Sequence, residues 1–246
     1  RVQASGRKWQ EGIGVALTMS RSGCTEIAAE VGGIGVAGSV LEDADIAKAV
    51  GTAIDAFGRL DAAVFGAGRH SEVMRNYDLL SPPAATRDSF SYDPEYRRDI
   101  FDIPWPAWHD DFEMMVLAPM RLAKAALPHL VASGNGSFVA ISGIEAGQPR
   151  APFPLGPTRL ALQGFIKLLA DRHGPDGVRF NTIAPGLMES AEKEFHSEWT
   201  ATVPLGRVGR NSEIGDAIAF LVSDASSYIT GQCLTADGGV NRPLGL

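Results

Sequence analysis

The chain has 246 residues, 45% of them hydrophobic, so it can bury a full core, and we expect a single domain over residues 1–246 rather than a disordered chain. It carries 22 basic and 29 acidic side chains, a net charge of −7 and a pI near 5.2, without a basic stripe, which argues against nucleic acid and anionic membranes as partners. Two cysteines, Cys24 and Cys233, are too few for a disulfide framework, and no apolar run approaches the roughly 18 residues of a membrane span, so we expect a cytoplasmic protein.

Short apolar runs that predict strands alternate with helical patterns along most of the chain. This alternation predicts an α/β fold with a doubly wound parallel sheet and helices on both faces. Pro157 suits the first turn of a helix that Gly174 can end, and Ser212 suits a helix N-cap. In chain order the expected elements are an apolar helix after the glycines of 12–14, a helix at 43–58, a strand at 59–68, a helix at 108–130, a strand at 136–143, a helix at 157–173, a strand at 177–186, a helix at 212–225 and a strand at 231–239.

Residues 69–107 form a long insertion without a regular pattern, rich in Pro, Tyr, Arg and Asp. A loop of this length inside a compact domain is uncommon and is frequently functional. We weigh two interpretations, a lid or partner-docking segment and a passive insertion.

The carboxy-terminal third carries three extended motifs: NTIAPG at 181–186, PLGRVGRNSEIGDAIAFLVSDASSYITGQ at 204–232 and ADGG at 236–239. These motifs resemble, run for run, the β-ketoacyl reductase branch of the short-chain dehydrogenase/reductase family, and the resemblance covers essentially the whole chain. It implies a Rossmann-type fold, a tetrameric assembly and binding of NAD or NADP. It does not by itself imply activity, because function depends on the residues of the site.

The segment that would hold the cofactor is altered. Three glycines survive from the family's glycine turn, where the pyrophosphate approaches a helix amino terminus, although the spacing is wider than in most members. Residues 25–40 begin within the helix that follows the family's second strand, so we expect that strand, with its ribose-reading side chain, to be absent. The candidate cofactor-binding residues are Gly6, Gly12, Gly14, Pro185 and Gly186.

The four positions that carry the family's chemistry are all substituted. The family uses a tyrosine as proton donor or acceptor, a lysine that lowers its pKa, a serine on the substrate oxygen and an asparagine that supports a proton-relay water. The resemblance places Leu155 at the tyrosine, Arg159 at the lysine, Gly143 at the serine and Met115 at the asparagine. A second register puts Pro152 at the tyrosine, and no register supplies a phenol. Arg159 can hold a phosphate or carboxylate without exchanging protons near neutral pH, or it can be an ordinary exposed residue of a first helical turn.

Replacement groups occur elsewhere in the sequence. Ser142 lies one residue before the serine position, and Glu145 and His70 follow strand ends, where the sites of open α/β sheets form. The insertion offers phenols, for which ordinary loop packing is the other interpretation, and these are Tyr77, Tyr92 and Tyr96. The histidines His109, His129, His173 and His196 have no metal-ligand spacing, so no metal site is expected.

The changes are concentrated in the site, while the helices at 108–130 and 157–173 and the end of the chain, which build the tetramer contacts in the family, are preserved. The leading hypothesis is a catalytically inactive subunit that assembles, as a homo- or heterotetramer, with an active NAD(P)-dependent member handling an alcohol/ketone pair. The alternative is an enzyme with a remodelled site, either an oxidoreductase with a relocated acid or a lyase, isomerase or dehalogenase that needs no nicotinamide. A ligand-sensing regulator that uses the fold as a binding module stays open as a third interpretation.

Overall fold

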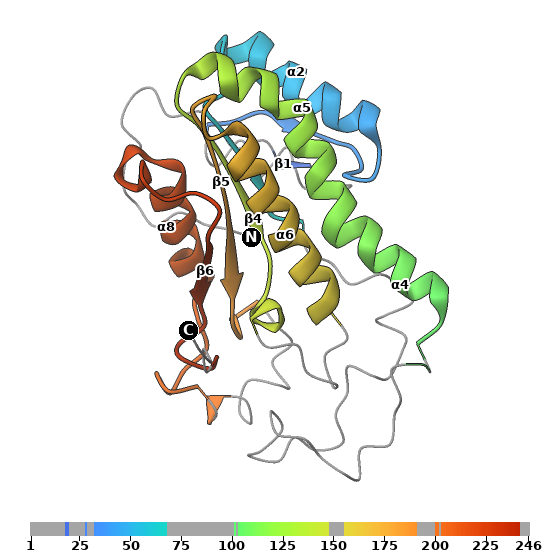
Figure 1. The fold of residues 1–246 in the computed structure, drawn as a ribbon, viewed down its shortest axis with the longest axis vertical. Coiled ribbons are helices and arrows are strands. Elements are labelled where there is room, and N and C mark those ends of the chain that lie inside the picture. Colours follow the sequence, from blue (N-terminus) through green and yellow to red (C-terminus); the bar gives the residue numbers. More distant parts are fainter. Residues whose placement is uncertain are drawn as a thin grey trace.

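A computed structural model describes residues 18–19, 28, 32–67, 101, 103–147, 155–190, 200–201 and 203–241 of the chain. The predicted α/β architecture is confirmed, with a main sheet of parallel strands in the order β3-β4-β5-β6 (Figure 1). These strands are β3 (Ala62–Phe65), β4 (Gly136–Ile141), β5 (Val178–Pro185) and β6 (Cys233–Ala236). A separate parallel pair, β1 (Thr18–Met19) and β2 (Gly35–Val36), precedes them in the chain.

Helices connect successive strands, as parallel pairing requires. The α-helices are α2 (Asp43–Phe57), α4 (Trp105–Phe112), α5 (Ala118–Ser133), α6 (Gly156–His173) and α8 (Asn211–Val222). Three short segments complete the described structure: the π-helix η2 (Glu113–Leu117) and the 3₁₀ turns η3 (Ile144–Ala146) and η5 (Asp224–Ser226).

Alternate residues of each strand are buried on opposite faces of the sheet. Phe138 and Ala140 belong to the larger core cluster together with residues of α5 and α6, and the ring centroids of Phe138 and Phe180 lie 5.6 Å apart. Val139 and Ile183 belong to a second cluster with residues of α8, on the opposite face (Figure 1). The period-two alternation of a strand therefore divides the core into two layers around the sheet.

Helices α4, η2 and α5 form one continuous helix, Trp105–Ser133, which is long and apolar enough by length and composition to cross a membrane. Ala123, Ala126 and Leu130 of this helix are buried in the main core cluster, so it packs as a core helix of the domain. The helix begins at Trp105, inside the stretch 69–107 that the sequence predicted to be irregular.

Three local predictions are wrong. The apolar helix expected after the glycines of 12–14 is not present at Thr18–Met19, which forms strand β1; a short apolar run does not distinguish strand from helix by its periodicity. Ser212 does not cap α8, because the helix begins one residue earlier and Arg210 holds the N-cap position. Strand β2 lies in the segment 25–40, where the sequence predicted a helix and no strand. The other predicted helices and strands of the described part are present with shifts of a few residues at their ends.

Candidate functional site

The substituted positions of the sequence analysis are brought together at the carboxyl end of β4. Gly143 follows the strand, η3 comes directly after it, and the first turn of α6 packs against η3 and η2. Met115 lies in the centre of η2, and π-helical segments inside α-helices are frequent at functional sites. The structure brings these four residues into one region, although nothing in the geometry alone assigns them a role.

Leu155 and Met115 fill their surroundings with apolar atoms. Leu155 is 3% exposed and packs in a small cluster with Ile103 and Ala107, to which Trp108 contributes a half-buried side chain. Met115 is likewise 3% exposed. Neither side chain can exchange a proton, so this part of the site provides shape and no acid–base chemistry.

Arg159 is neither free nor an ordinary exposed side chain. Its Nε lies 3.4 Å from Oε2 of Glu145, and the two side chains are only 12% and 24% exposed. Gly143 is the residue that makes room for the pair, because a Cβ at this position would lie 2.4 Å from Glu145 Oε2 and 2.7 Å from Arg159 Nε. The glycine, the acid and the arginine therefore depend on one another.

Asp111 is a buried acid that the sequence analysis missed. Its side chain is fully buried, one helical turn before Met115, and its Oδ2 lies 2.7 Å from the hydroxyl of Thr158 in the first turn of α6. Burial raises the pKa of Asp111, and the hydrogen bond from Thr158 and the positive charge of Arg159 oppose this rise. The sequence contains an indication of this acid. Asp111 lies at helical spacing between Ala107 and Met115, on the buried face of the helix, where an unpaired carboxyl group is rare.

Ser142 places a hydroxyl on the same side of the sheet. It continues the alternation of Phe138 and Ala140, which face α5 and α6, and its Oγ is buried without a hydrogen-bond partner. Asp111 Oδ1 is also buried without a partner. The polar side chains of the site among the described residues thus include Asp111, Thr158, Ser142 and the Glu145–Arg159 pair, and only the two carboxyl groups among them can exchange a proton near neutral pH.

The candidate cofactor residues that the structure describes are tied to the end of the chain. The backbone N–H of Gly186 donates to the carbonyl of Ala236 at 3.1 Å, and a Cβ at Gly186 would lie 2.7 Å from the Cα and Cβ of Asp237. Close packing on the ADGG turn therefore explains this glycine without a nucleotide. Pro185 ends β5 beside it, while Gly6, Gly12 and Gly14 lie outside the described residues.

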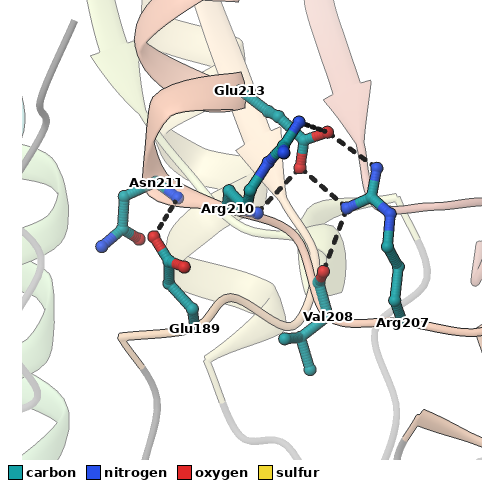
Figure 2. Close-up of polar contacts among 6 residues, drawn as sticks. All are labelled: Glu189, Arg207, Val208, Arg210, Asn211 and Glu213. Carbon is teal, nitrogen blue, oxygen red and sulfur yellow. Dashed lines mark hydrogen bonds and ion pairs between the residues drawn. The ribbon is translucent and has the colours of Figure 1, made fainter. Parts of the chain in front are cut away.

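A polar network fixes the segment that joins β5 to α8 (Figure 2). Glu213 accepts a hydrogen bond at 2.8 Å from the backbone N–H of Arg210 and binds the Arg207 guanidinium through both oxygens, at 2.7 and 2.9 Å. Glu189, which follows β5, accepts the backbone N–H of Asn211 at 2.9 Å. Two carboxylates thus satisfy backbone groups at the start of α8 and hold the two flanks of the connection together.

Two grooves with volumes of about 310 and 330 Å³ flank the edge strand β6, and both are lined by Thr182, Gln232 and Cys233. Neither is lined by the polar residues at the end of β4. Burial raises the pKa of the Cys233 thiol, which makes it a poor nucleophile. The described residues hold no group of three His, Cys, Asp or Glu side chains that could bind a metal ion.

Several candidates of the sequence analysis lie outside the described residues: His70, Tyr77, Tyr92, Tyr96, Pro152 and His196. A relocated phenol or imidazole from the insertion therefore stays a prediction. Of the histidines in the described part, His173 is mostly buried and its Nδ1 lies 2.9 Å from Asp176, at the end of α6 away from the site.

Residues 84–241 match the family model described as enoyl-(acyl carrier protein) reductase. The chain is 33% identical, over 94% of its length, to a protein of Streptomyces violaceoruber named as putative ketoacyl reductase 2 of the granaticin polyketide synthase, and it covers 87% of that protein. It is 32% identical, over 68% of its length, to dehydrogenase/reductase SDR family member 4 of Homo sapiens, of which it spans 60%.

Solved structures have the same architecture. The TT0495 protein of Thermus thermophilus superimposes with a TM-score of 0.72 at 25% identity, covering 92% of this chain and 87% of that one. A structure titled ribose-5-phosphate isomerase, from Brucella melitensis 16M, gives a TM-score of 0.74 at 23% identity over 91% of this chain and 81% of the other, a similarity that concerns the fold alone.

Proposed function

The chain belongs to the short-chain dehydrogenase/reductase family of oxidoreductases, and we propose that it is a catalytically degenerate member that works as a subunit beside an active, NAD(P)-dependent member. The active partner would act on an alcohol/ketone pair such as a ketoacyl group, the substrate class in the name of the Streptomyces relative. The assembly would be a cytoplasmic homo- or heterotetramer, with protein surfaces rather than nucleic acid or membrane as its contacts.

The burial of Leu155 carries this proposal. At the position that corresponds to the family's proton-donating phenol, the chain has a leucine that is 3% exposed inside an apolar cluster. A leucine that was merely tolerated in an open active site would be solvated, whereas this one packs against Ile103 and Ala107. Around it, the described residues at the start of α6 and the end of β4 include no phenol and no ammonium group.

The surface supports association. Large apolar side chains remain exposed on α6, where Leu160 is 43% and Leu168 65% exposed, and at Tyr228, which is fully exposed. We propose that these side chains are covered by a neighbouring subunit, because burial of apolar area stabilises association. Members of the family typically use NAD or NADP; in this chain, packing on the ADGG turn suffices to explain Gly186, so we propose that the nucleotide is bound mainly by the partner.

The test compares the purified chain with an active family member from the same source. We expect no NADH- or NADPH-dependent reduction of a ketoacyl thioester by the chain alone, and a mixed oligomer in native mass spectrometry after co-expression. Leu168→Glu, at a site 65% exposed, should abolish the mixed oligomer, whereas Lys48→Glu on α2 should not. Reductase turnover by the isolated chain, at a rate typical of enzymes, would overturn the proposal.

A second candidate, an enzyme with a remodelled site, is favoured by one specific observation. Ser142 Oγ, Glu145 Oε2 and Arg159 Nε are buried at the carboxyl end of β4 without a hydrogen-bond partner, and the last two atoms meet only in the 3.4 Å ion pair. Two carboxyl groups there, Asp111 and Glu145, can in principle carry a proton. If the isolated chain shows any turnover, Glu145→Gln should abolish it, and Glu42→Gln, an exposed acid before α2, should leave it unchanged.

A further inference from the structure

We infer that Asp111 is held as a neutral carboxylic acid in the folded protein, at pH values where an exposed aspartate is ionised, and that its proton fastens the long helix to the first turn of α6. This inference rests on the contacts of Asp111 and does not depend on the proposed function.

The Thr158 hydroxyl faces two hydrogen-bond acceptors but carries only one hydrogen atom. The Thr158 hydroxyl lies 2.7 Å from Asp111 Oδ2 and 2.9 Å from the carbonyl oxygen of Leu155. A hydroxyl carries one hydrogen, so with an ionised Asp111 it can serve only one of these two acceptors well. With a protonated Asp111, the acid donates to the Thr158 oxygen and the Thr158 hydrogen is free for the Leu155 carbonyl, so both contacts are satisfied.

Asp111 is buried without a cationic partner among the described residues. Asp111 is 0% exposed, and its other oxygen, Oδ1, is buried without a hydrogen-bond partner. An ionised carboxylate in such a place costs several kcal/mol unless it is paired. No cationic side chain of the described residues lies within ion-pair distance of it.

Among the residues that the structure describes, few charged groups face this position. From α6, the positive charge of Arg159 acts on Asp111 and favours the ionised form. That charge is already opposed by Glu145 of η3, whose Oε2 lies 3.4 Å from Arg159 Nε. Thr158 is uncharged, and the next acid on the same helix, Asp110, is exposed. Burial therefore outweighs the attraction of Arg159.

The consequence is a pH-sensitive contact. Because the folded protein holds the proton more tightly than the unfolded chain does, the stability from protonated Asp111 is fully present below the unfolded pKa and is lost as the pH rises through the higher folded pKa. Ionisation places an unpaired charge against the turn that positions Leu155, so the packing of the long helix on α6 weakens with rising pH.

The decisive experiment follows the carboxyl carbon of Asp111 by NMR during a pH titration of the intact chain, with Asp111→Asn to assign the signal. We expect a midpoint above the ordinary range of aspartate. Thr158→Val should raise it further, because the Thr158 hydroxyl binds the ionised carboxylate more strongly than it binds the neutral acid, and Thr158→Ser should leave it unchanged. A midpoint of the wild-type chain at or below that of an exposed aspartate would overturn the inference. This outcome does not depend on whether the variants fold.

Urea unfolding gives an independent readout. Asn resembles the neutral acid, so Asp111→Asn should match the wild type at acidic pH and become the more stable protein as the pH rises, with the ratio of unfolding constants changing up to about tenfold per pH unit between the two pKa values. Asp110→Asn, next to it on the exposed face, should follow the wild type throughout. If Asp111→Asn is instead less stable and the deficit grows with pH, Asp111 is an ionised acid and the inference fails.

Discussion

Arg159 and Glu145 form their ion pair in the space that a side chain at position 143 would occupy. The pair measures 3.4 Å from Nε to Oε2, and a Cβ built on Gly143 would come within 2.7 Å of both atoms. In the family, a serine and a lysine are expected at positions 143 and 159. A serine at position 143 is incompatible with the Arg159–Glu145 pair in this geometry, because its Cβ would overlap both side chains.

Gly143→Ala should displace the ion pair without unfolding the protein. The atoms that the new Cβ meets belong to flexible side chains, so we expect a loss of about 1 kcal/mol in the free energy of unfolding, the scale of a partly exposed ion pair. Glu145→Ala removes the same pair, so the two changes made together should cost clearly less than their sum. Urea unfolding of the two single variants and the double variant measures this coupling. If the losses in the free energy of unfolding were strictly additive, the new Cβ and the ion pair would not compete for the same space.

Gly51→Ala is the matched control for a glycine that packing does not require. Gly51 lies in the middle of α2, and a Cβ there meets nothing within 4 Å. Alanine should therefore stabilise the protein by about 0.5–1 kcal/mol through its higher helix propensity. If alanine raises the free energy of unfolding at position 51 and lowers it at position 143 in the same assay, the effect of helix propensity is separated from that of steric exclusion.

Leu155→Ala should cost about 2–3 kcal/mol, because it removes a buried side chain from a small apolar cluster and leaves a cavity. Leu160→Ala, five residues further along α6 at a site 43% exposed, should cost less than about 0.5 kcal/mol. Chemical unfolding at neutral pH compares the two. Equal and small effects would mean that Leu155 is not packed in solution, and the argument that it fills the place of a catalytic group would fall.

Most of the fold follows from local patterns, and most of the polar site does not. The helix at 43–58 was predictable because its apolar spacing is periodic and Gly58, in the left-handed conformation, ends it. The role of Asp111 depends on Thr158, 47 residues away, and the Glu145–Arg159 pair depends on a glycine that pattern reasoning reads only as a lost serine. Such relationships arise when the ends of β4 and α6 meet, and periodicity carries no information about them. Strand β1 was missed for a different reason, since its short apolar run fits both the helical period of 3.6 and the strand period of 2.

Arg179→Met should be among the most destabilising single changes outside the site. This arginine is 6% exposed on β5, and its guanidinium donates to three backbone carbonyls, those of Leu221, Ser223 and Ser226, at 2.8 to 3.2 Å. Removing the guanidinium takes the charge-assisted hydrogen bonds from these carbonyls, at a cost of about 2–3 kcal/mol. The carbonyls then keep only neutral donors, among them the Ser137 hydroxyl on Leu221 and the backbone N–H groups of Ser226 and Ile229.

The comparison for Arg179 is Arg172→Met, on α6 with a side chain 74% exposed, for which we expect a change below about 0.5 kcal/mol. Thermal unfolding followed by circular dichroism distinguishes the two variants. Arg179→Lys should recover only part of the loss, because one ammonium cannot reach all three carbonyls in the geometry of a guanidinium. Full recovery by lysine would indicate that charge, and not the fork of donors, is what the site requires.

Glu213→Gln should remove an acid-dependent part of the stability at the start of α8 (Figure 2). The hydrogen bonds from Arg207 and from the Arg210 backbone lower the pKa of Glu213 from 4.5 to about 2. Because the folded pKa is below the unfolded one, this contribution is fully present above about pH 4.5 and is lost as the pH falls toward 2. The difference in unfolding free energy between wild type and Glu213→Gln should therefore be constant near neutrality, at about 0.5–1 kcal/mol for an exposed cap and ion pair, and should shrink through this window.

Two controls sharpen the test of Glu213. Added salt should reduce the difference at neutral pH, since the guanidinium of Arg207 is half exposed. Glu42→Gln, an exposed acid at the N-cap of α2 that makes no side-chain capping bond, provides the baseline for acid unfolding. If the difference for Glu213 keeps its neutral value down to pH 2, the Glu213 carboxylate is not the group that holds the segment. The remaining contacts, such as the bond from Asn211 N–H to Glu189 and the backbone pairing between Glu189 and Gly209, would then hold it.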